Sequence, residues 1–235
     1  EIYKILNTLL TEENLKIVSV SEIIGKGSYG SVFKCRNGDG NNIAVKVIEN
    51  LKPEDEKILE NEIRALNEFS DSKNVVGKHK DYVTSYKKTE AGVVHRYIVM
   101  QYIKGKVLKD LLSVRHSGFY VVEYEYALYY IHQIITGIKD IHDKGWAHRD
   151  IKLENIMVDE KDNCHIIDLG LAVNVDNPLL QKVYNYTCKN VRGTAQFAAP
   201  EIVNPDHIDS TEPFDCRKAD IFAAGVCLYN MLCGI

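Results

Sequence analysis

A glycine-rich stretch between β-favouring segments is the strongest constraint on how the first part of this chain can fold. The letters GKGSYG occupy residues 25–30, and residues 31–35 after them are rich in β-favouring side chains. In a dinucleotide-binding unit, glycines with this spacing open a helix. Here a strand, a turn and another strand follow, so the sequence predicts that the glycines lie at the tip of a β-hairpin. Glycines there let backbone N–H groups approach phosphate oxygens closely.

The remaining pattern predicts strands in the first part of the chain and helices in the second. Pro53 is suited to opening a helix, and the letters NGDG at residues 37–40 predict a hairpin turn. A change from strands to helices near residues 101–105 marks a boundary between two parts. The predicted elements are helices at residues 1–12, 53–69 and 123–143 and strands at 16–20, 31–35, 42–47, 81–85 and 97–102.

Composition excludes several function classes. The 235 residues are 45% hydrophobic and 26% charged, as in an ordinary globular protein. A formal net charge of −4 provides no basic surface for nucleic acid or for an anionic membrane. The apolar run at 221–235 is too short to cross a bilayer.

The six cysteines show no CxxC spacing, which predicts reduced thiols in a cytoplasmic protein, with the nucleus also possible. Cys227 and Cys233 are expected in the core.

Five short motifs occur in one order along the chain. They are GKGSYGSV at 25–32, IAVK at 43–46, HRD at 148–150 followed by Asn155, DLG at 168–170 and APE at 199–201. Each motif is weak by itself, but the ordered set resembles the protein kinase family from about Ile17 to the last residue. The resemblance implies an α+β, protein-kinase-like fold of two lobes. The N-lobe would be an antiparallel sheet plus one helix, and the C-lobe would be mainly helical and incomplete.

This resemblance also divides the chain and implies its reaction. Residues 1–15 would form a flanking helix, 16–102 the N-lobe and 103–235 a partial C-lobe that lacks its last helices. The chain resembles serine/threonine protein kinases, which transfer the γ-phosphate of ATP to protein hydroxyls with the help of Mg²⁺. The alternatives are a catalytically inactive kinase-fold scaffold and a small-molecule kinase, and APE and the segment before it disfavour the latter.

The resemblance assigns the chemistry of the C-lobe to four residues. Asp150 would accept the proton of the substrate hydroxyl, and Lys152 would neutralise charge on the γ-phosphate. Asn155 and Asp168 would bind Mg²⁺, which prefers oxygen ligands. Lysine at position 152 resembles serine/threonine kinases rather than tyrosine kinases. Glu154 resembles a position that contacts basic substrate residues in some kinases.

Lys46 lies in an apolar strand, where a lysine is costly unless it is paired. The resemblance implies two partners for it, the ATP phosphates and a glutamate on the next helix. Helical periodicity selects Glu62 over Glu60, because Glu62 shares a stripe with apolar residues. Glu56, Glu60 and Arg64 fall on the opposite face, although Glu62 as a mere boundary charge is the alternative.

The resemblance also implies a nucleotide site. Met100 would lie beside the adenine pocket, with an ordinary core methionine as a compatible reading. The backbones of Gln101 and Ile103 would bond the adenine edge. The residues assigned to nucleotide binding are Gly25, Lys26, Gly27, Ser28, Tyr29, Gly30, Val32, Ala44, Lys46, Met100, Gln101 and Ile103.

Two further expectations concern regulation and the central helix of the C-lobe. The segment between Gly170 and Ala199 resembles an activation loop, and a phosphate placed there by an upstream kinase could pair with Arg149. Thr187 is the first candidate for this phosphate, with Tyr184 and Tyr186 as alternatives. Asp220 is expected to cap an apolar helix and to bond back to the catalytic loop. That helix is expected to be buried, with Ile221 and Phe222 on its apolar face.

Overall fold

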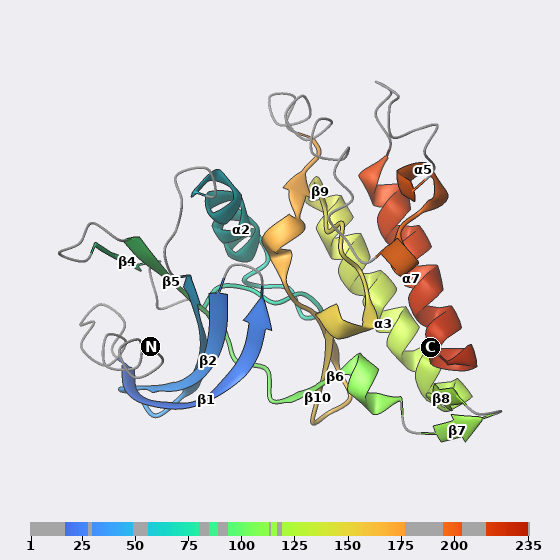
Figure 1. Cartoon of the computed structure of the whole chain (residues 1–235), viewed down its shortest axis with the longest axis horizontal. Helices are drawn as coiled ribbons and strands as arrows, with labels where there is room; N and C mark the ends of the chain where they lie inside the picture. The colour runs from blue at the N-terminus through green and yellow to red at the C-terminus, as the bar shows by residue number, and fades with distance from the viewer. Residues whose placement is uncertain are drawn as a thin grey trace. The chain divides into compact units, whose positions relative to one another are not determined.

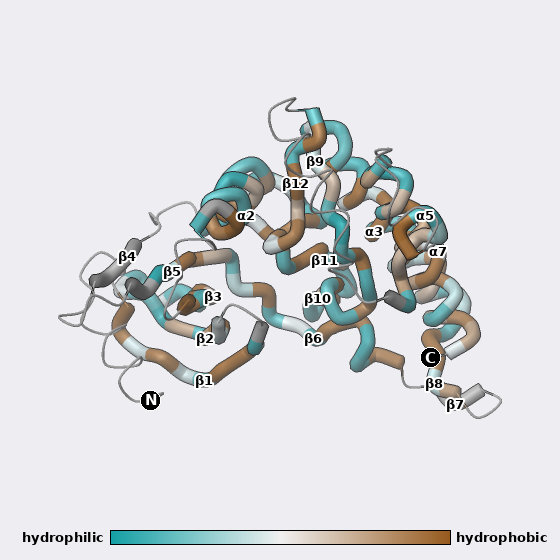
Figure 2. The backbone as a smooth tube through the Cα atoms, turned by 45° about the horizontal axis from the view of Figure 1, so that its top comes forward, coloured by the Kyte–Doolittle hydropathy of each residue, from teal (hydrophilic) through white to brown (hydrophobic). Residues whose placement is uncertain are grey.

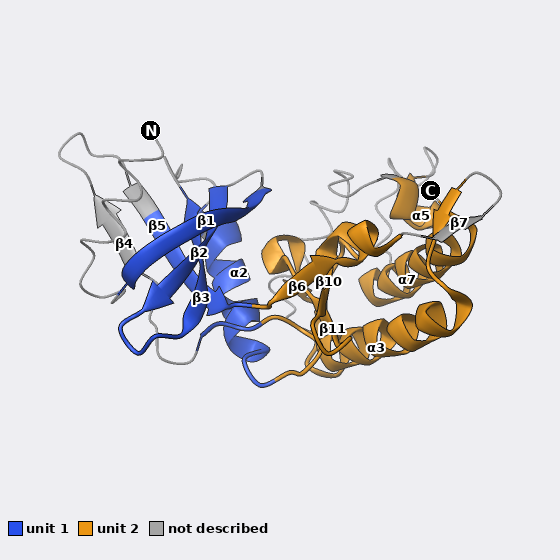
Figure 3. Cartoon of the chain, turned by 90° about the horizontal axis from the view of Figure 1, so that it is seen from below, with its two compact units in different colours: residues 1–71, 77–102 blue, residues 72–76, 103–235 orange. Residues whose placement is uncertain are grey.

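The computed structural model divides the chain into two compact units, coloured separately in Figure 3. Unit 1 comprises residues 1–71 and 77–102, and unit 2 comprises residues 72–76 and 103–235. The structure describes residues 17–27, 30–48, 56–79, 85–88, 94–112, 114–116, 119–176, 195–203 and 215–234. The helix predicted for the first residues and the three candidate phosphorylation sites lie outside these ranges.

Unit 1 is built on a five-stranded antiparallel sheet, as predicted for the N-lobe (Figure 1). The strand order is β1-β2-β3-β5-β4. Alternate residues of β2, β3 and β5 form a core that includes Phe33, Val45 and Val99. The strands are β1 (Ile17–Gly27), β2 (Gly30–Asn37), β3 (Asn42–Ile48), β4 (Ser85–Lys88) and β5 (Val94–Gln101).

The glycine-rich stretch lies at the end of the β1–β2 hairpin, which confirms the predicted strand–turn–strand arrangement. The antiparallel register runs to Gly27 opposite Gly30. A Cβ atom on Gly30 would lie 2.0 Å from the carbonyl oxygen of Val47 on β3. Close contact with the neighbouring strand therefore requires glycine at position 30, independently of any phosphate. A Cβ atom added at Gly25 would lie 3.6 Å from its nearest neighbour, a side-chain atom of Val32, which is an ordinary contact distance.

Helix α2 (Glu56–Glu68) presents a mixed surface, and Figure 2 shows hydrophobic and hydrophilic residues alternating along it. Leu59, Leu66 and Glu62 are all buried, so these positions share a face as predicted. Glu56, on the opposite face, has a side chain that is 45% exposed and pairs with Arg96 of β5 at 2.6 Å. The stretch before α2, including Pro53, lies outside the described residues.

Unit 2 is organised around two long helices, α3 (Tyr124–Asp143) and α7 (Cys216–Cys233), which pack against each other. Buried residues of α3, such as Ile134, Ile138 and Ile141, recur on one face. The other elements are β6 (Gly105–Val107), η2 (Leu108–Leu111), β7 (Val114–His116), β8 (Phe119–Val121), β9 (Trp146–Ala147), η3 (Leu153–Asn155), β10 (Ile156–Asp159), β11 (Cys164–Ile166), η4 (Leu169–Leu171), β12 (Val173–Asn174), η5 (Ala195–Phe197) and α5 (Pro200–Val203). Unit 2 is therefore mainly helical, as expected for the C-lobe.

Residues 72–76 pack with unit 2 although their neighbours on both sides belong to unit 1. The side-chain amide of Asn74 donates to the carbonyl oxygen of Cys164 at 2.8 Å, and the backbone N–H of Val76 donates to Ile166 at 2.8 Å. Ser72 donates its hydroxyl to Asp140 of α3 at 2.8 Å. These bonds attach the segment to β11 and α3.

Helix α7 differs from its prediction in two respects. Asp215, not Asp220, caps its N-terminus by accepting the backbone N–H of Arg217 at 3.0 Å. Ile221 and Phe222 are exposed rather than buried, whereas Ala224, Cys227 and Met231 face the core. The prediction placed the start of the helix at Asp220, where the apolar run begins. The polar first turn from Cys216 belongs to the same helix.

Cysteine burial also departs in part from expectation. Cys227 is buried and Cys233 is exposed, so the prediction of a core position is wrong for Cys233. Burial raises the pKa of the Cys35 and Cys164 thiols to about 12. Among the described helices, none has the length and apolar character needed to cross a membrane.

The turn between β10 and β11 is organised by the carboxylate of Asp159. It accepts the backbone N–H groups of Lys161 and Asn163 at 2.8 and 2.9 Å and lies 3.1 Å from Nε2 of His165. Burial opposes ionisation of Asp159, but these hydrogen bonds outweigh it and hold its pKa well below the usual range.

Gly30→Ala tests the contact between β2 and β3. The added methyl group overlaps the Val47 carbonyl, so we expect the free energy of unfolding to fall by about 1–3 kcal/mol. Gly25→Ala is the matched control and should change it by less than about 1 kcal/mol. Urea denaturation measures both, and equal effects of the two substitutions would contradict the close approach.

Asp159→Asn tests the turn and its pH dependence. We expect the variant to lose about 1–2 kcal/mol of unfolding free energy at pH 7, because charge-assisted hydrogen bonds are lost. A carboxylate with a lowered folded pKa stabilises above its unfolded pKa of about 4, and this contribution fades as the pH falls below that value. The difference from wild type should therefore shrink between pH 5 and pH 3 in urea titrations. Asp143→Asn, at an exposed ion pair with Lys139, should show little difference at either pH.

Candidate active site

A carboxylate buried in unit 2 anchors the backbone of the predicted catalytic loop. Asp220 of α7 is 1% exposed and accepts the backbone N–H groups of His148 and Arg149 at 2.8 and 2.7 Å. Nε2 of His142, on α3, lies 3.0 Å from the same carboxylate. The predicted bond from Asp220 back to the loop is confirmed, and it is made from the second turn of the helix.

His148 holds the loop from inside. Its ring is fully buried, and its Nδ1 accepts the backbone N–H of Asp150 at 3.2 Å. The other ring nitrogen, Nε2, therefore carries the proton and donates it to the carbonyl oxygen of Ile167 at 3.1 Å. The imidazole thus ties Asp150 to the residue before Asp168. Arg149, which lies between His148 and Asp150 in the sequence, has a φ of 71°. This is a left-handed conformation that non-glycine residues seldom adopt.

Asp150, Lys152 and Asn155 form one cluster. Lys152 Nζ lies 2.7 Å from Oδ2 of Asp150, and the side-chain amide of Asn155 donates to the same oxygen at 2.8 Å. The amide also bonds the backbone carbonyl of Asp150 at 2.9 Å. Within the described residues both side-chain contacts fall on Oδ2, so Oδ1 is available to accept a further donor.

Asn155 and Asp168, the two predicted metal ligands, are linked through the backbone. The N–H of Ile167 donates to the carbonyl of Asn155 at 2.8 Å, one residue before Asp168. Asp168 is exposed, has a φ of 63° and accepts the N–H of Gly170 at 3.3 Å. The amide nitrogen of Asn155 is bound to Asp150, so its Oδ1 is the atom available to a cation. Carboxylate and amide oxygens suit Mg²⁺, so these residues fit the ion.

Unit 1 contains the predicted pair of Lys46 and Glu62. Lys46 Nζ lies 2.5 Å from Oε1 of Glu62, and the side chains are only 11% and 5% exposed. Strand β3 places Lys46 with its neighbours buried on both sides, and α2 supplies the glutamate from its buried face. Removing the carboxylate would leave the ammonium buried without a counter-charge, which is strongly unfavourable.

Most of the other residues predicted to bind nucleotide lie on the strands of unit 1. Ala44 is buried on β3 opposite Met100 on β5, and Met100 is half-buried. The backbone N–H of Gln101 donates to Gly77 at 3.2 Å, so only its carbonyl remains for a ligand on that residue. Ile103 belongs to unit 2. Gly25, Lys26, Gly27, Gly30 and Val32 lie on the β1–β2 hairpin, whereas Ser28 and Tyr29 lie outside the described residues.

Sequence reasoning missed the partner of Glu154. Lys109, on η2, places its Nζ 2.7 Å from Oε1 of Glu154 on η3. Burial opposes ionisation of Glu154, but this hydrogen bond and a backbone N–H outweigh it and lower its pKa. The two residues are 45 positions apart, and neither has a local sequence signal that would reveal the contact.

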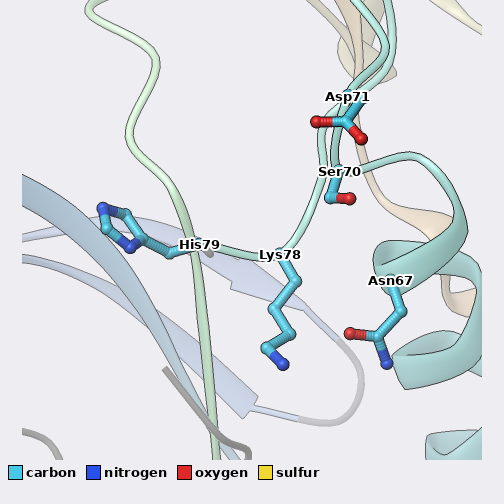
Figure 4. Close-up of a pocket in the computed structure, with 5 residues that line it drawn as sticks. All are labelled: Asn67, Ser70, Asp71, Lys78 and His79. Carbon is cyan, nitrogen blue, oxygen red and sulfur yellow. The ribbon is translucent and has the colours of Figure 1, made fainter. Parts of the chain in front are cut away.

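A cavity of about 270 Å³ in unit 1 is lined by Asn67, Ser70, Asp71, Lys78 and His79. Figure 4 shows that the side chains of Lys78 and Asn67 extend in a similar direction, whereas the His79 ring points away from them. None of the residues predicted to bind nucleotide or metal is among the five that line it.

The chain is similar to known protein kinases over most of its length. A family model described as "Protein kinase domain" matches residues 18–235. CBL-interacting protein kinase 10 of Oryza sativa subsp. japonica is 31% identical over 221 residues, covering 94% of this chain and 44% of the relative. CBL-interacting serine/threonine-protein kinase 13 of Arabidopsis thaliana is 29% identical, covering 92% and 39%. Maternal embryonic leucine zipper kinase of Danio rerio is 29% identical, covering 95% and 30%. The chain thus spans less than half the length of these relatives.

Glu62→Gln tests how strongly stability depends on the carboxylate that pairs with Lys46. The change leaves the Lys46 ammonium buried without its counter-charge, so we expect a loss of about 3 kcal/mol of unfolding free energy. The double variant Lys46→Met/Glu62→Leu removes both charges and should recover most of that loss. Urea denaturation of the single and double variants measures the coupling between them. Additive losses would show that the two side chains do not depend on each other.

Proposed function

Since the chain belongs to the protein kinase family, we propose that it is a serine/threonine protein kinase that transfers the γ-phosphate of ATP to protein hydroxyls. The observation that carries this proposal is the cluster of Asp150, Lys152 and Asn155. Phosphoryl transfer requires positioning and charge neutralisation rather than covalent chemistry, and the cluster supplies both.

In this mechanism Asp150 orients the substrate hydroxyl and receives its proton. Lys152 and Asn155 both bond Oδ2 of Asp150, so they fix the carboxylate and leave Oδ1 to accept the hydroxyl. His148 and Asp220 hold the loop backbone, so the carboxylate does not have to reorganise during the reaction. Lys152 is near enough to Asp150 to neutralise charge that develops on the phosphoryl group.

Two residues of unit 2 and the ion pair of unit 1 would handle the nucleotide. Mg²⁺, held by Asn155 and Asp168, would neutralise phosphate charge and fix the geometry of ATP. The contact with Glu62 restricts the Lys46 side chain, which would prepare the ammonium for the α- and β-phosphates. The backbone of the β1–β2 hairpin would cover the phosphates.

Substrate type, regulation and location complete the proposal. Lys152 favours serine and threonine over tyrosine, and the names of several relatives include serine/threonine-protein kinase. Arg149 would receive a phosphate added by an upstream kinase, at Thr187 or alternatively at Tyr184 or Tyr186. The cytoplasm, or the nucleus, is the expected location.

Asp150→Asn and Asp168→Asn test the proposed activity. Phosphate transfer from Mg-ATP to a serine/threonine peptide library should fall about 10³-fold or more in each, because several kcal/mol of transition-state stabilisation is lost. The exposed Asp143→Asn is the control and should retain the wild-type rate. Transfer by wild type to tyrosine alone would contradict the substrate class. ATP binding without transfer by the full chain would favour a kinase-fold scaffold.

A further inference from the structure

Lys109 forms an ion pair with Glu154, which directly precedes Asn155 of the cluster with Asp150 and Lys152. Both residues belong to unit 2, and their side chains are 47% and 37% exposed. Their backbones are fixed, because the neighbouring residues Leu108 and Leu153 are fully buried. The pair therefore joins η2 and η3 through two partly exposed side chains.

Glu154 lies close to where a peptide must bind. It directly precedes Asn155, whose amide bonds Asp150 at 2.8 Å. A peptide that brings a hydroxyl to Asp150 extends about 3.3 Å per residue in either direction. Its position next to Asn155 makes Glu154 a candidate to contact a long basic side chain two or three residues from that hydroxyl.

Lys109 satisfies Glu154 incompletely. Its ammonium bonds Oε1, whereas Oε2 is buried and has no hydrogen-bond donor within the part of the chain that the structure describes. An ammonium is a point charge, but a guanidinium presents two parallel N–H groups that match both oxygens of a carboxylate. An arginine would therefore pair with Glu154 better than Lys109 does.

We propose that Lys109 is a specificity-determining residue that masks Glu154, so that a substrate arginine must displace it to bind. The inference rests on the proposed kinase function. The masking lowers the preference of the wild-type protein for basic peptides. It also makes that preference favour arginine over lysine, because a lysine only repeats the contact that Lys109 already makes.

Peptide kinetics with the full chain test the masking. A serine peptide carries a single arginine, lysine or glutamine at each position around the serine, and kcat/KM is measured for every peptide. In Lys109→Met we expect the arginine-to-glutamine ratio to rise about three- to tenfold at one position, the gain typical of a freed, half-buried carboxylate. In Glu154→Gln the ratio at that position should fall to about one.

Lys104→Met is the matched control. Lys104 also forms a 2.7 Å ion pair, with Glu160, and it is exposed in the same unit. The substitution changes the net charge equally, so it should leave the arginine-to-glutamine ratio unchanged. A rise in this ratio in both lysine variants would indicate a general effect of net charge and would overturn the proposal.

Peptide binding without ATP gives a second readout that does not need catalysis. Fluorescence anisotropy with labelled arginine and glutamine peptides should show tighter arginine binding in Lys109→Met than in wild type, by a similar factor. An unchanged ratio in both assays would overturn the masking of Glu154. Loss of phosphate transfer in every variant, with the binding ratio still shifted, would overturn the kinase function and leave the binding site intact.

Discussion

The carboxylate of Asp220 fixes the backbone from which the catalytic residues project. It accepts two consecutive N–H groups, from His148 and Arg149, and consecutive N–H groups point to one acceptor only when the backbone turns sharply. Arg149 adopts its left-handed conformation at this turn. The strain, on the order of 1 kcal/mol or more, persists because the surrounding bonds determine it. The backbone thus positions Asp150, and its contacts with Lys152 and Asn155 then orient its carboxylate.

Sequence patterns predicted those features that depend on local periodicity or on the cost of burying charge. Alternating β-favouring residues around the glycines implied a hairpin, and the register from Ile17 to Gly27 against β2 has that form. A lysine in an apolar strand implied a carboxylate partner, and the helical stripe indicated Glu62. Lys46 and Glu62 do pair, because a buried ammonium leaves few arrangements that the fold can tolerate.

Features that depend on distant contacts were not accessible from the sequence. The apolar run after Asp220 suggested a helix start at that residue, but the polar first turn from Cys216 belongs to the same helix. Burial could not be assigned either, because Ile221 and Phe222 are exposed while alanines of α7 face the core. Gly30 was assigned to phosphate binding, yet the carbonyl of Val47 on the adjacent strand already excludes a side chain there.

Three lysine–carboxylate pairs, one in unit 1 and two in unit 2, differ in burial, and burial decides which of them a ligand can exchange. In the pair of Lys46 with Glu62 the side chains are 11% and 5% exposed, and in that of Lys152 with Asp150 they are 20% and 10% exposed. Separating a buried pair costs about 3–5 kcal/mol, so such pairs serve as fixed parts. An exposed pair contributes only up to about 1 kcal/mol. The pair of Lys109 with Glu154 is the most exposed of the three, so breaking it costs little free energy. One charge-assisted contact from a peptide arginine that replaces the lysine offsets that cost.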